Sequence, residues 1–296
     1  MKWVSSKLTD SEIPFSVHNE MSFPIHGIQY IHFPMLMTGR RDLSVKVGQY
    51  GSRTKDVFGK ICKMFFKVDN DDLSRNSTIC NSAYIKEIFK KYYGDQTKAQ
   101  VLYPPCFIPN HLATPFSNRD DAIVLMGRAD PRKRFEDAIS VQHGCLQNGV
   151  RLKLHIVTSG GDIHYLNLLK NKTAIHQDVF WHINIGRDEL ASLLSTCKYG
   201  LHCMHGEHFG MATAEMAGAG CVVFGHDSGG TREILPYDQL RFTSVDDAVK
   251  KIVTVHNHSG LRQELSEKLL SRSKMFSHTE FCAKIMVIVN AFATRV

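Results

Sequence analysis

The sequence predicts an α/β fold made of doubly wound parallel sheets, and two observations lead to this prediction. From residue 121 to residue 225, short apolar runs alternate with longer amphipathic segments. Strands and helices that alternate in this way form parallel sheets with right-handed crossovers. The chain has 296 residues, of which 43% are hydrophobic, so it can bury a large core. We therefore expect two Rossmann-like domains.

In the second half of the chain, the expected elements follow one another in regular alternation. The expected strands span residues 121–127, 151–158, 179–185, 199–204 and 221–225. The expected helices span residues 134–147, 166–170, 189–197 and 210–217. In such a sheet, ligands collect beyond the carboxyl ends of the strands. Arg128, Glu207 and Ser228 each come shortly after an expected strand, so the sequence places all three at one rim.

The first 112 residues are less regular. The expected strands span residues 27–32, 77–81 and 100–103, and the expected helices span residues 57–66 and 83–93. A complete doubly wound half contains more strands, so we expect an incomplete N-terminal domain. At the other end of the chain, a helix begins after its cap Ser277, with Glu280 at the third helical position. The apolar residues of this helix, from Phe281 to Phe292, form a stripe.

Composition indicates a globular protein, with 22% charged residues and a net charge of +7. No stretch approaches the roughly 18 apolar residues of a membrane span, and residues 1–6 do not lead into the apolar core of a signal peptide. We expect a cytoplasmic protein. The positive charge leaves open a peripheral contact with the cytosolic face of a membrane. No zinc-finger, helix-turn-helix or basic–aromatic pattern suggests a nucleic-acid partner.

We expect neither a metal nor a cofactor. The eight cysteines are scattered without a C-x-x-C motif, which favours reduced, buried thiols over a metal site or a disulfide framework. Asp69 and Asp71 have the spacing of a D-x-D motif, but their surroundings are those of a polar loop.

The segment from Glu207 to Glu215 carries the most chemistry. If a helix starts near Gly210, Glu215 lies in its second turn and Glu207 lies in the loop before it. The backbone N–H groups of Phe209, Gly210 and Met211 then point into the same cleft. Such N–H groups bind anions, because they are unpaired and lie at the positive end of the helix dipole. Since a carboxylate accepts hydrogen bonds from hydroxyl groups, the segment fits a diphosphate that carries a hydroxyl-rich group.

This segment resembles the E-x7-E motif of retaining glycosyltransferases with the GT-B fold, in family 4 (group 1). Three further segments are similar to motifs of that family and occur in the family's order. They are Gly127 to Lys133 (G-R-x-x-x-x-K), Ala217 to Val223, and Ser228 to Glu233 (S/T-G-G-x-x-E). The resemblance covers nearly the whole chain, although the opening strands of the N-terminal half have no counterpart. Residues 30–34 and 101–106 look most like the branch of dolichol-linked α-1,2-mannosyltransferases that use GDP-mannose.

The resemblance implies three parts. Residues 1–112 would be a partial, acceptor-side domain, and residues 113–276 would bind the nucleotide-sugar donor. Residues 277–296 would form a C-terminal helix that packs back on the first domain.

The resemblance also implies roles for the site residues. Glu215 would hold the ribose hydroxyls of the nucleotide, and Glu207 would lie near the donor sugar or the phosphates. Arg128 and Lys133 would stabilise the diphosphate as negative charge grows on it, the alternative being a solvated basic loop.

The remaining implied contacts are less specific. Phe209, Gly210 and Met211 would cradle the phosphate or sugar through their amides, although His208 stands where members of the family often have glycine. Gly229 and Gly230 would either add further amides or serve only to form a tight turn. His32 would face the donor sugar from the other domain, and a structural role is the alternative.

The implied activity is transfer of a sugar, with mannose as the candidate, from a nucleotide sugar to an unidentified glycan, lipid-linked or small-molecule acceptor with retained configuration. The attack is from the front face and the leaving phosphate helps to take the acceptor proton, so we name no enzymatic base. Two alternatives remain open. One is a truncated or degenerate protein that binds the nucleotide sugar without turnover or serves as a partner subunit. The other is a sugar-nucleotide epimerase on the same fold.

Overall fold

The structure is a computed structural model, and it describes residues 12–21, 23, 25–34, 75–94, 98–107 and 114–294. The chain divides into two compact units. Unit 1 comprises residues 1–104 and 281–296, and unit 2 comprises residues 105–280. The expected helix at 57–66 and the acidic stretch at 69–72 lie outside the described residues.

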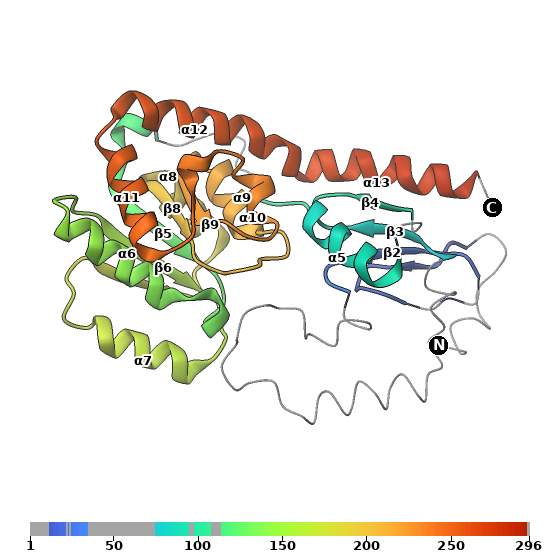
Figure 1. The fold of residues 1–296 in the computed structure, drawn as a ribbon, viewed down its shortest axis with the longest axis horizontal. Coiled ribbons are helices and arrows are strands. Elements are labelled where there is room, and N and C mark those ends of the chain that lie inside the picture. The colour runs from blue at the N-terminus through green and yellow to red at the C-terminus, as the bar shows by residue number, and fades with distance from the viewer. Residues whose placement is uncertain are drawn as a thin grey trace. The chain divides into compact units, whose positions relative to one another are not determined.

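Unit 2 is built on one six-stranded sheet in which all paired strands are parallel (Figure 1). The strands are β5 (Asp120–Met126), β6 (Lys153–Thr158), β7 (Val179–Ile183), β8 (Cys197–His202), β9 (Val222–His226) and β10 (Arg241–Phe242). Their order across the sheet is β10-β9-β8-β5-β6-β7. The chain therefore builds the sheet outward from β5 in one direction and then from β8 in the other. This is the doubly wound order, with its switch point between β5 and β8.

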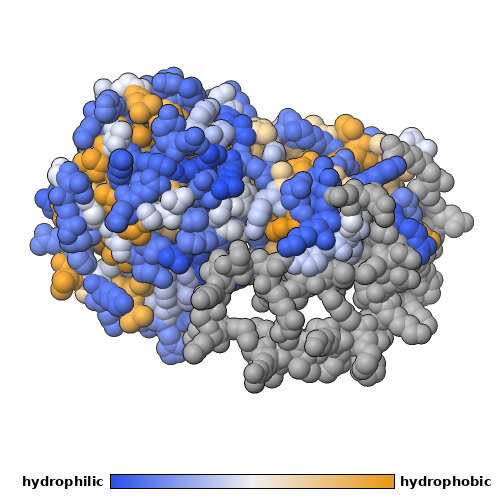
Figure 2. Space-filling model, viewed as in Figure 1, coloured by the Kyte–Doolittle hydropathy of each residue, from blue (hydrophilic) through white to orange (hydrophobic). Residues whose placement is uncertain are grey.

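Helices connect these strands and cover the sheet. They are α6 (Phe135–Gln147), α7 (Ile163–Thr173), α8 (Arg187–Thr196), α9 (Met211–Gly218), α10 (Thr231–Ile234), α11 (Val245–His256) and α12 (Ser259–Ser273). Helix α6 contacts α11, and α9 contacts α12. The central strand β5 is apolar and almost wholly buried from Ala122 to Leu125, because both faces of the sheet are covered. On the visible face of unit 2, hydrophilic residues predominate and apolar residues are scattered among them (Figure 2).

The predicted alternation of strands and helices between residues 121 and 225 is confirmed. Helix α7 is longer than the predicted 166–170, because the side chain of Asp162 accepts hydrogen bonds from the N–H groups of His164 and Tyr165 and starts the helix early. Strand β10 and helices α10, α11 and α12 lie between the predicted strand at 221–225 and the predicted C-terminal helix, and were not predicted.

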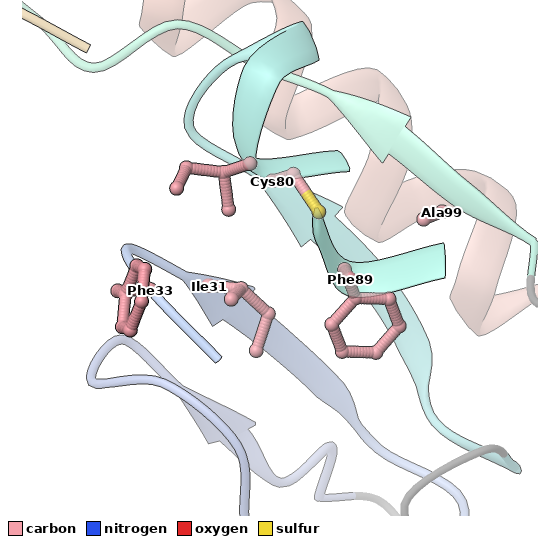
Figure 3. Close-up of a cluster of buried hydrophobic side chains, with 6 residues drawn as sticks. Ile31, Phe33, Cys80, Phe89 and Ala99 are labelled. Atoms are coloured by element: carbon pink, nitrogen blue, oxygen red, sulfur yellow. The ribbon is translucent and has the colours of Figure 1, made fainter. Parts of the chain in front are cut away.

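Unit 1 contains a four-stranded parallel sheet in the order β1-β2-β3-β4. The strands are β1 (Phe15–Ser16), β2 (Ile28–Ile31), β3 (Ser77–Cys80) and β4 (Ala99–Val101), and helix α5 (Ala83–Tyr93) joins the last two. The Ser82 side chain accepts a hydrogen bond from the Ile85 N–H, and Gly94 ends the helix with φ of 90°. Helix α5 packs Ile85 and Phe89 against Ile31, Cys80 and neighbouring residues of the sheet (Figure 3).

A second core of unit 1 involves the C-terminal helix, α13 (His278–Ala293). Phe292 of this helix is buried with Ile28, Tyr30, Ile79 and Leu102, and the rest of the apolar stripe packs against them. Ser277 caps the helix as predicted, since its hydroxyl accepts from the Glu280 N–H at 3.2 Å. Among the helices of the described residues, none has the length and apolar character needed to cross a membrane.

The divisions between the units fall after residues 104 and 280, rather than after the expected residues 112 and 276. Cys106 explains the first shift. It forms a parallel bridge with Ser277, and its N–H donates to the Phe276 carbonyl at 2.8 Å. The segment that begins at Pro105 is therefore held by backbone contacts within unit 2.

Candidate functional site

The carboxyl ends of β5 and β8 bring together two of the predicted site residues. Lys133 follows β5 and Glu207 follows β8, and the Lys133 Nζ atom lies 2.6 Å from Glu207 Oε2. The two side chains are 24% and 14% exposed. Arg128, also after β5, is exposed, and no ion pair links it to another described residue. The switch point of the sheet thus carries one cation that is paired and one that is open to solvent.

Local structure after β5 fixes the position of Lys133. Asp130 caps a short 3-10 turn over Pro131–Lys133, and its carboxylate also pairs with Arg132. The aliphatic stem of Lys133 lies over Gly127, where an added Cβ would be 3.6 Å from Lys133 Cδ. Arg132 pairs with Asp130, so Lys133 is the residue of this basic run whose side chain extends to the loop after the neighbouring strand, β8.

Glu207 is held through both of its carboxylate oxygens. Oε2 accepts a hydrogen bond from Lys133, and Oε1 accepts one from the backbone N–H of His208 at 3.1 Å. Burial raises the pKa of this carboxyl, but the nearby His202 and the charge of Lys133 outweigh burial and hold the pKa well below its usual range. Glu207 is therefore a permanent anion whose first partner is Lys133.

His202 is a site residue that the sequence analysis missed. It ends β8 and its side chain is 2% exposed. Its Nε2 atom lies 3.1 Å from Glu207 Oε2, and Nε2 has no hydrogen-bond partner among the described residues. A histidine at the end of a buried strand, five positions before Glu207, was the available signal.

The turn after β9 packs directly on the backbone of the Glu207 loop. The Gly230 N–H donates to the Glu207 carbonyl at 2.8 Å, and the Gly206 N–H donates to the Ser228 hydroxyl at 2.8 Å. The Gly230 amide is therefore engaged within the protein. Gly229 has φ of +66°, and an added Cβ would lie 2.3 Å from the Glu207 carbonyl oxygen. Both glycines therefore take part in a close turn, and a contact of the Gly229 amide with a ligand stays a prediction.

Glu215 lies on α9, in its second turn as predicted. Gly210 precedes the helix with φ of 110°, which favours glycine, and Met211 at the first position is 48% exposed. The first-turn N–H groups are those that a helix leaves without an internal acceptor. Phe209 is buried edge-on against Phe276, with ring centroids 5.3 Å apart.

The surroundings of Glu215 differ from those of Glu207. Its Oε1 atom accepts one long hydrogen bond, 3.4 Å, from the Phe107 N–H. Burial raises the pKa of Glu215, and the Phe107 amide and the charge of Arg187 only partly offset this effect. The Arg187 guanidinium also lies 5.7 Å from the centre of the Phe107 ring. Glu215 is thus the carboxylate with unused acceptor capacity.

His32 belongs to unit 1, where it follows β2. Its N–H donates to Asn19 Oδ1 at 2.9 Å, and its Nε2 atom lies 3.2 Å from the Val17 carbonyl oxygen. Its exposed ring meets Tyr30 edge-on. These contacts give His32 a structural role within unit 1, and its approach to a donor sugar stays a prediction.

Within the ranges that the structure describes, no three or more His, Cys, Asp or Glu residues are arranged to hold a metal ion. The protein cations predicted for this rim are Arg128 and Lys133.

Replacement of Gly229 by alanine should destabilise the protein by about 2–4 kcal/mol, because the side chain adds a clash with the Glu207 backbone to an unfavourable φ. Chemical denaturation of the full chain measures the effect. Gly260→Ala is the matched control, since a Cβ there meets nothing and alanine favours the helix. Equal stability of the two variants would contradict the tight packing.

Glu207→Gln and Glu215→Gln should change stability in opposite directions at pH 7. The pKa of Glu207 is lower in the folded protein than in the unfolded chain, so its ionised carboxylate stabilises the fold at pH values above the unfolded-state pKa. This stability is lost as the pH falls through the folded-state pKa. The pKa of Glu215 is higher in the folded protein than in the unfolded chain, so the pH dependence is opposite. Its contribution to stability is present below the unfolded-state pKa and is lost as the pH rises through the folded-state pKa.

We therefore expect Glu207→Gln to lose about 1–3 kcal/mol at pH 7 and Glu215→Gln to gain stability. Thermal unfolding of both variants checks these expectations. It is measured between pH 4 and pH 8, an interval of about four pH units that includes the pKa of a carboxyl group in the unfolded chain. Two variants that shift in the same direction throughout this interval would contradict the assignment.

Comparison with known proteins bears on this site. A GDP-Man:Man(3)GlcNAc(2)-PP-Dol alpha-1,2-mannosyltransferase from Xenopus laevis is 25% identical over 261 residues, which cover 77% of this chain and 52% of the relative. The chain thus spans about half the length of this relative. Sucrose-phosphate synthase from Thermosynechococcus elongatus has a TM-score of 0.69 at 15% identity, over 93% of this chain and 69% of that structure. HepE from Anabaena, solved with UDP and glucose, has a TM-score of 0.67 at 16% identity, over 90% and 71% of the two chains.

These structural matches and the two parallel sheets show the GT-B, Rossmann-like fold that the sequence predicted. The family model of the glycosyl transferases group 1 matches residues 110–270, which is more than half of the chain. This range contains Arg128, Lys133, His202, Glu207 and Glu215. The chain therefore belongs to the glycosyl transferases group 1 family.

Proposed function

We propose that this protein transfers mannose from GDP-mannose to a lipid-linked glycan, with retention of the anomeric configuration. The observation that supports it most is the set of groups at the switch point. Arg128, the Lys133–Glu207 pair and the first turn of α9 lie after β5 and β8, where doubly wound sheets bind nucleotides. The relatives with GDP-Man and PP-Dol in their names support the choice of donor and acceptor.

In this proposal, Arg128 and Lys133 hold the diphosphate. Cleavage of the sugar–phosphate bond leaves negative charge on the departing nucleoside diphosphate, so fixed cations stabilise the transition state more than the ground state. Since no metal is needed for this stabilisation, the site works with protein cations alone. The leaving phosphate takes the proton of the acceptor hydroxyl, and the acceptor attacks from the same face.

Glu215 holds the ribose in this proposal. Its carboxylate accepts one long hydrogen bond in the free protein, which leaves oxygen lone pairs for two hydroxyl groups. Glu207 holds Lys133 in place and, through it, the phosphates. A lipid-linked acceptor would bring the protein to a membrane surface, and the net charge of +7 favours an anionic surface of this kind.

The first test is donor binding followed by product analysis. Calorimetry of the full chain in a chelator should show GDP binding, with UDP and ADP as competitors of the same charge. Incubation with GDP-mannose and a lipid-linked glycan should then give an α-mannoside, identified by its anomeric coupling in NMR. Failure of all three nucleotides to bind at millimolar concentration would overturn the proposal. Binding without product would favour the degenerate protein, and a changed sugar nucleotide would favour the epimerase.

The second test separates the phosphate contacts from general charge effects. Arg128→Ala should weaken GDP binding by about 10- to 100-fold, because a charged hydrogen bond contributes roughly 1.5–3 kcal/mol, and should leave guanosine binding unchanged. Lys153→Ala removes the same charge at the amino end of β6, where Lys153 pairs with Asp120 at 3.0 Å, and serves as the control. Equal losses for GDP and guanosine in the Arg128 variant would instead indicate a folding defect.

A further inference from the structure

His202 combines deep burial with a polar atom that faces the site. Its side chain is 2% exposed, and its imidazole Nε2 atom lies 3.1 Å from Glu207 Oε2. Within the described part of the chain, Nε2 has no hydrogen-bond partner. A buried ring nitrogen without a partner costs free energy, so the contact with Glu207 is the only interaction that offsets its burial there.

The same carboxylate oxygen receives the Lys133 ammonium group at 2.6 Å. Two side chains from different strands, His202 on β8 and Lys133 after β5, thus converge on one atom. The other oxygen, Oε1, accepts from the His208 N–H. Rotation of the Glu207 carboxylate would break all three contacts, so the imidazole restricts the carboxylate, and the carboxylate restricts the ammonium group.

We propose that His202 is a positioning residue of the donor site: the close contact of its Nε2 atom holds the Glu207 carboxylate, which in turn places the Lys133 ammonium against the diphosphate of the bound nucleotide. This inference rests on the proposed function and deepens it. Lys133 has three N–H donors, and its pairing with Glu207 takes one of them. The remaining donors can reach a phosphate only if the ammonium group stays at the switch point.

The proposal makes the contribution of His202 specific to phosphate. A residue that only fills the core would affect nucleoside and nucleotide binding alike when it is replaced. A residue that positions Lys133 affects the ligand with a diphosphate. The positioning role also requires an N–H donor at the position of the His202 Nε2 atom. A glutamine side chain can supply this donor, and the shorter asparagine side chain cannot.

The experiment measures GDP and guanosine affinity by calorimetry, in a chelator, for the full chain and for His202→Leu, His202→Gln and His202→Asn. We expect His202→Leu and His202→Asn to weaken GDP binding about tenfold, the loss of one polar contact of about 1.4 kcal/mol, with guanosine affinity unchanged. His202→Gln should bind GDP nearly as well as the unaltered protein. In a Lys133→Met background, His202→Leu should cause no further loss, because the group that it positions is absent.

The outcomes separate the inference from the proposed function. If the unaltered protein binds none of GDP, UDP and ADP, the proposed function falls and the inference falls with it. If GDP binds and His202→Leu weakens GDP and guanosine equally, or adds its loss in the Lys133→Met background, the inference alone is overturned. Should His202→Leu fail to fold, the comparison of Gln with Asn decides, since both are polar. Equal affinity of these two variants for GDP overturns the inference.

Discussion

The reversal of strand order between β5 and β8 is the constraint on which the site depends. Strands β6 and β7 extend the sheet on one side of this point, and β9 and β10 extend it on the other. The connections that follow β5 and β8 therefore leave in opposite directions, and no crossover covers the rim between them. Lys133 and Glu207 are 74 positions apart in the chain, and the topology alone makes them neighbours.

The Glu207 loop is fixed by its main chain as well as by its side chain. A buried carboxylate costs free energy unless it is paired and hydrogen-bonded, and Glu207 has Lys133 and the His208 N–H as partners. Its carbonyl oxygen accepts from Gly230, in a turn where a side chain at Gly229 would not fit. Because the two sets of contacts hold the same residue, the carboxylate is in place before any ligand arrives. A preorganised charge of this kind needs no rearrangement during the reaction.

The sequence predicts most of the fold, for reasons that can be traced to particular residues. Helix α5 begins and ends at the predicted residues because Ser82 and Gly94 are strong local signals. Strands β5 to β9 of unit 2 were found because both faces of the sheet are covered and each of these strands contains a short run rich in apolar residues. Strand β1 and strand β10 have two residues each, too short for a hydrophobic pattern. The position of Cys106 in unit 2 depends on a bridge to Ser277, a contact between distant residues that no local pattern encodes.

For the site, the sequence located the segments but not the pairing within them. Motif order placed Arg128, Lys133, Glu207 and Glu215 in the loops and the helix after parallel strands, and unit 2 has them there. The ion pair between Lys133 and Glu207 depends on distances across the sheet. The hydrogen bond from the Gly230 N–H to the Glu207 carbonyl depends on them as well. His202 went unnoticed because a histidine inside an apolar run has the same pattern as a structural core residue.

The two glutamates of the motif differ in their hydrogen bonds and in the direction in which their pKa values are shifted. This difference is consistent with different roles for the two residues. Glu207 has partners on both oxygens, and its pKa is lowered in spite of burial. Glu215 has one long hydrogen bond, and its pKa is raised. A carboxylate that is satisfied in the free protein gains little from a ligand, whereas one that is buried and poorly satisfied gains from any hydroxyl donor. The geometry therefore favours Glu207 as the support of a cation and Glu215 as the group that meets the ligand. An under-satisfied carboxylate costs stability in the free protein, and a hydroxyl-bearing ligand recovers that free energy when it binds.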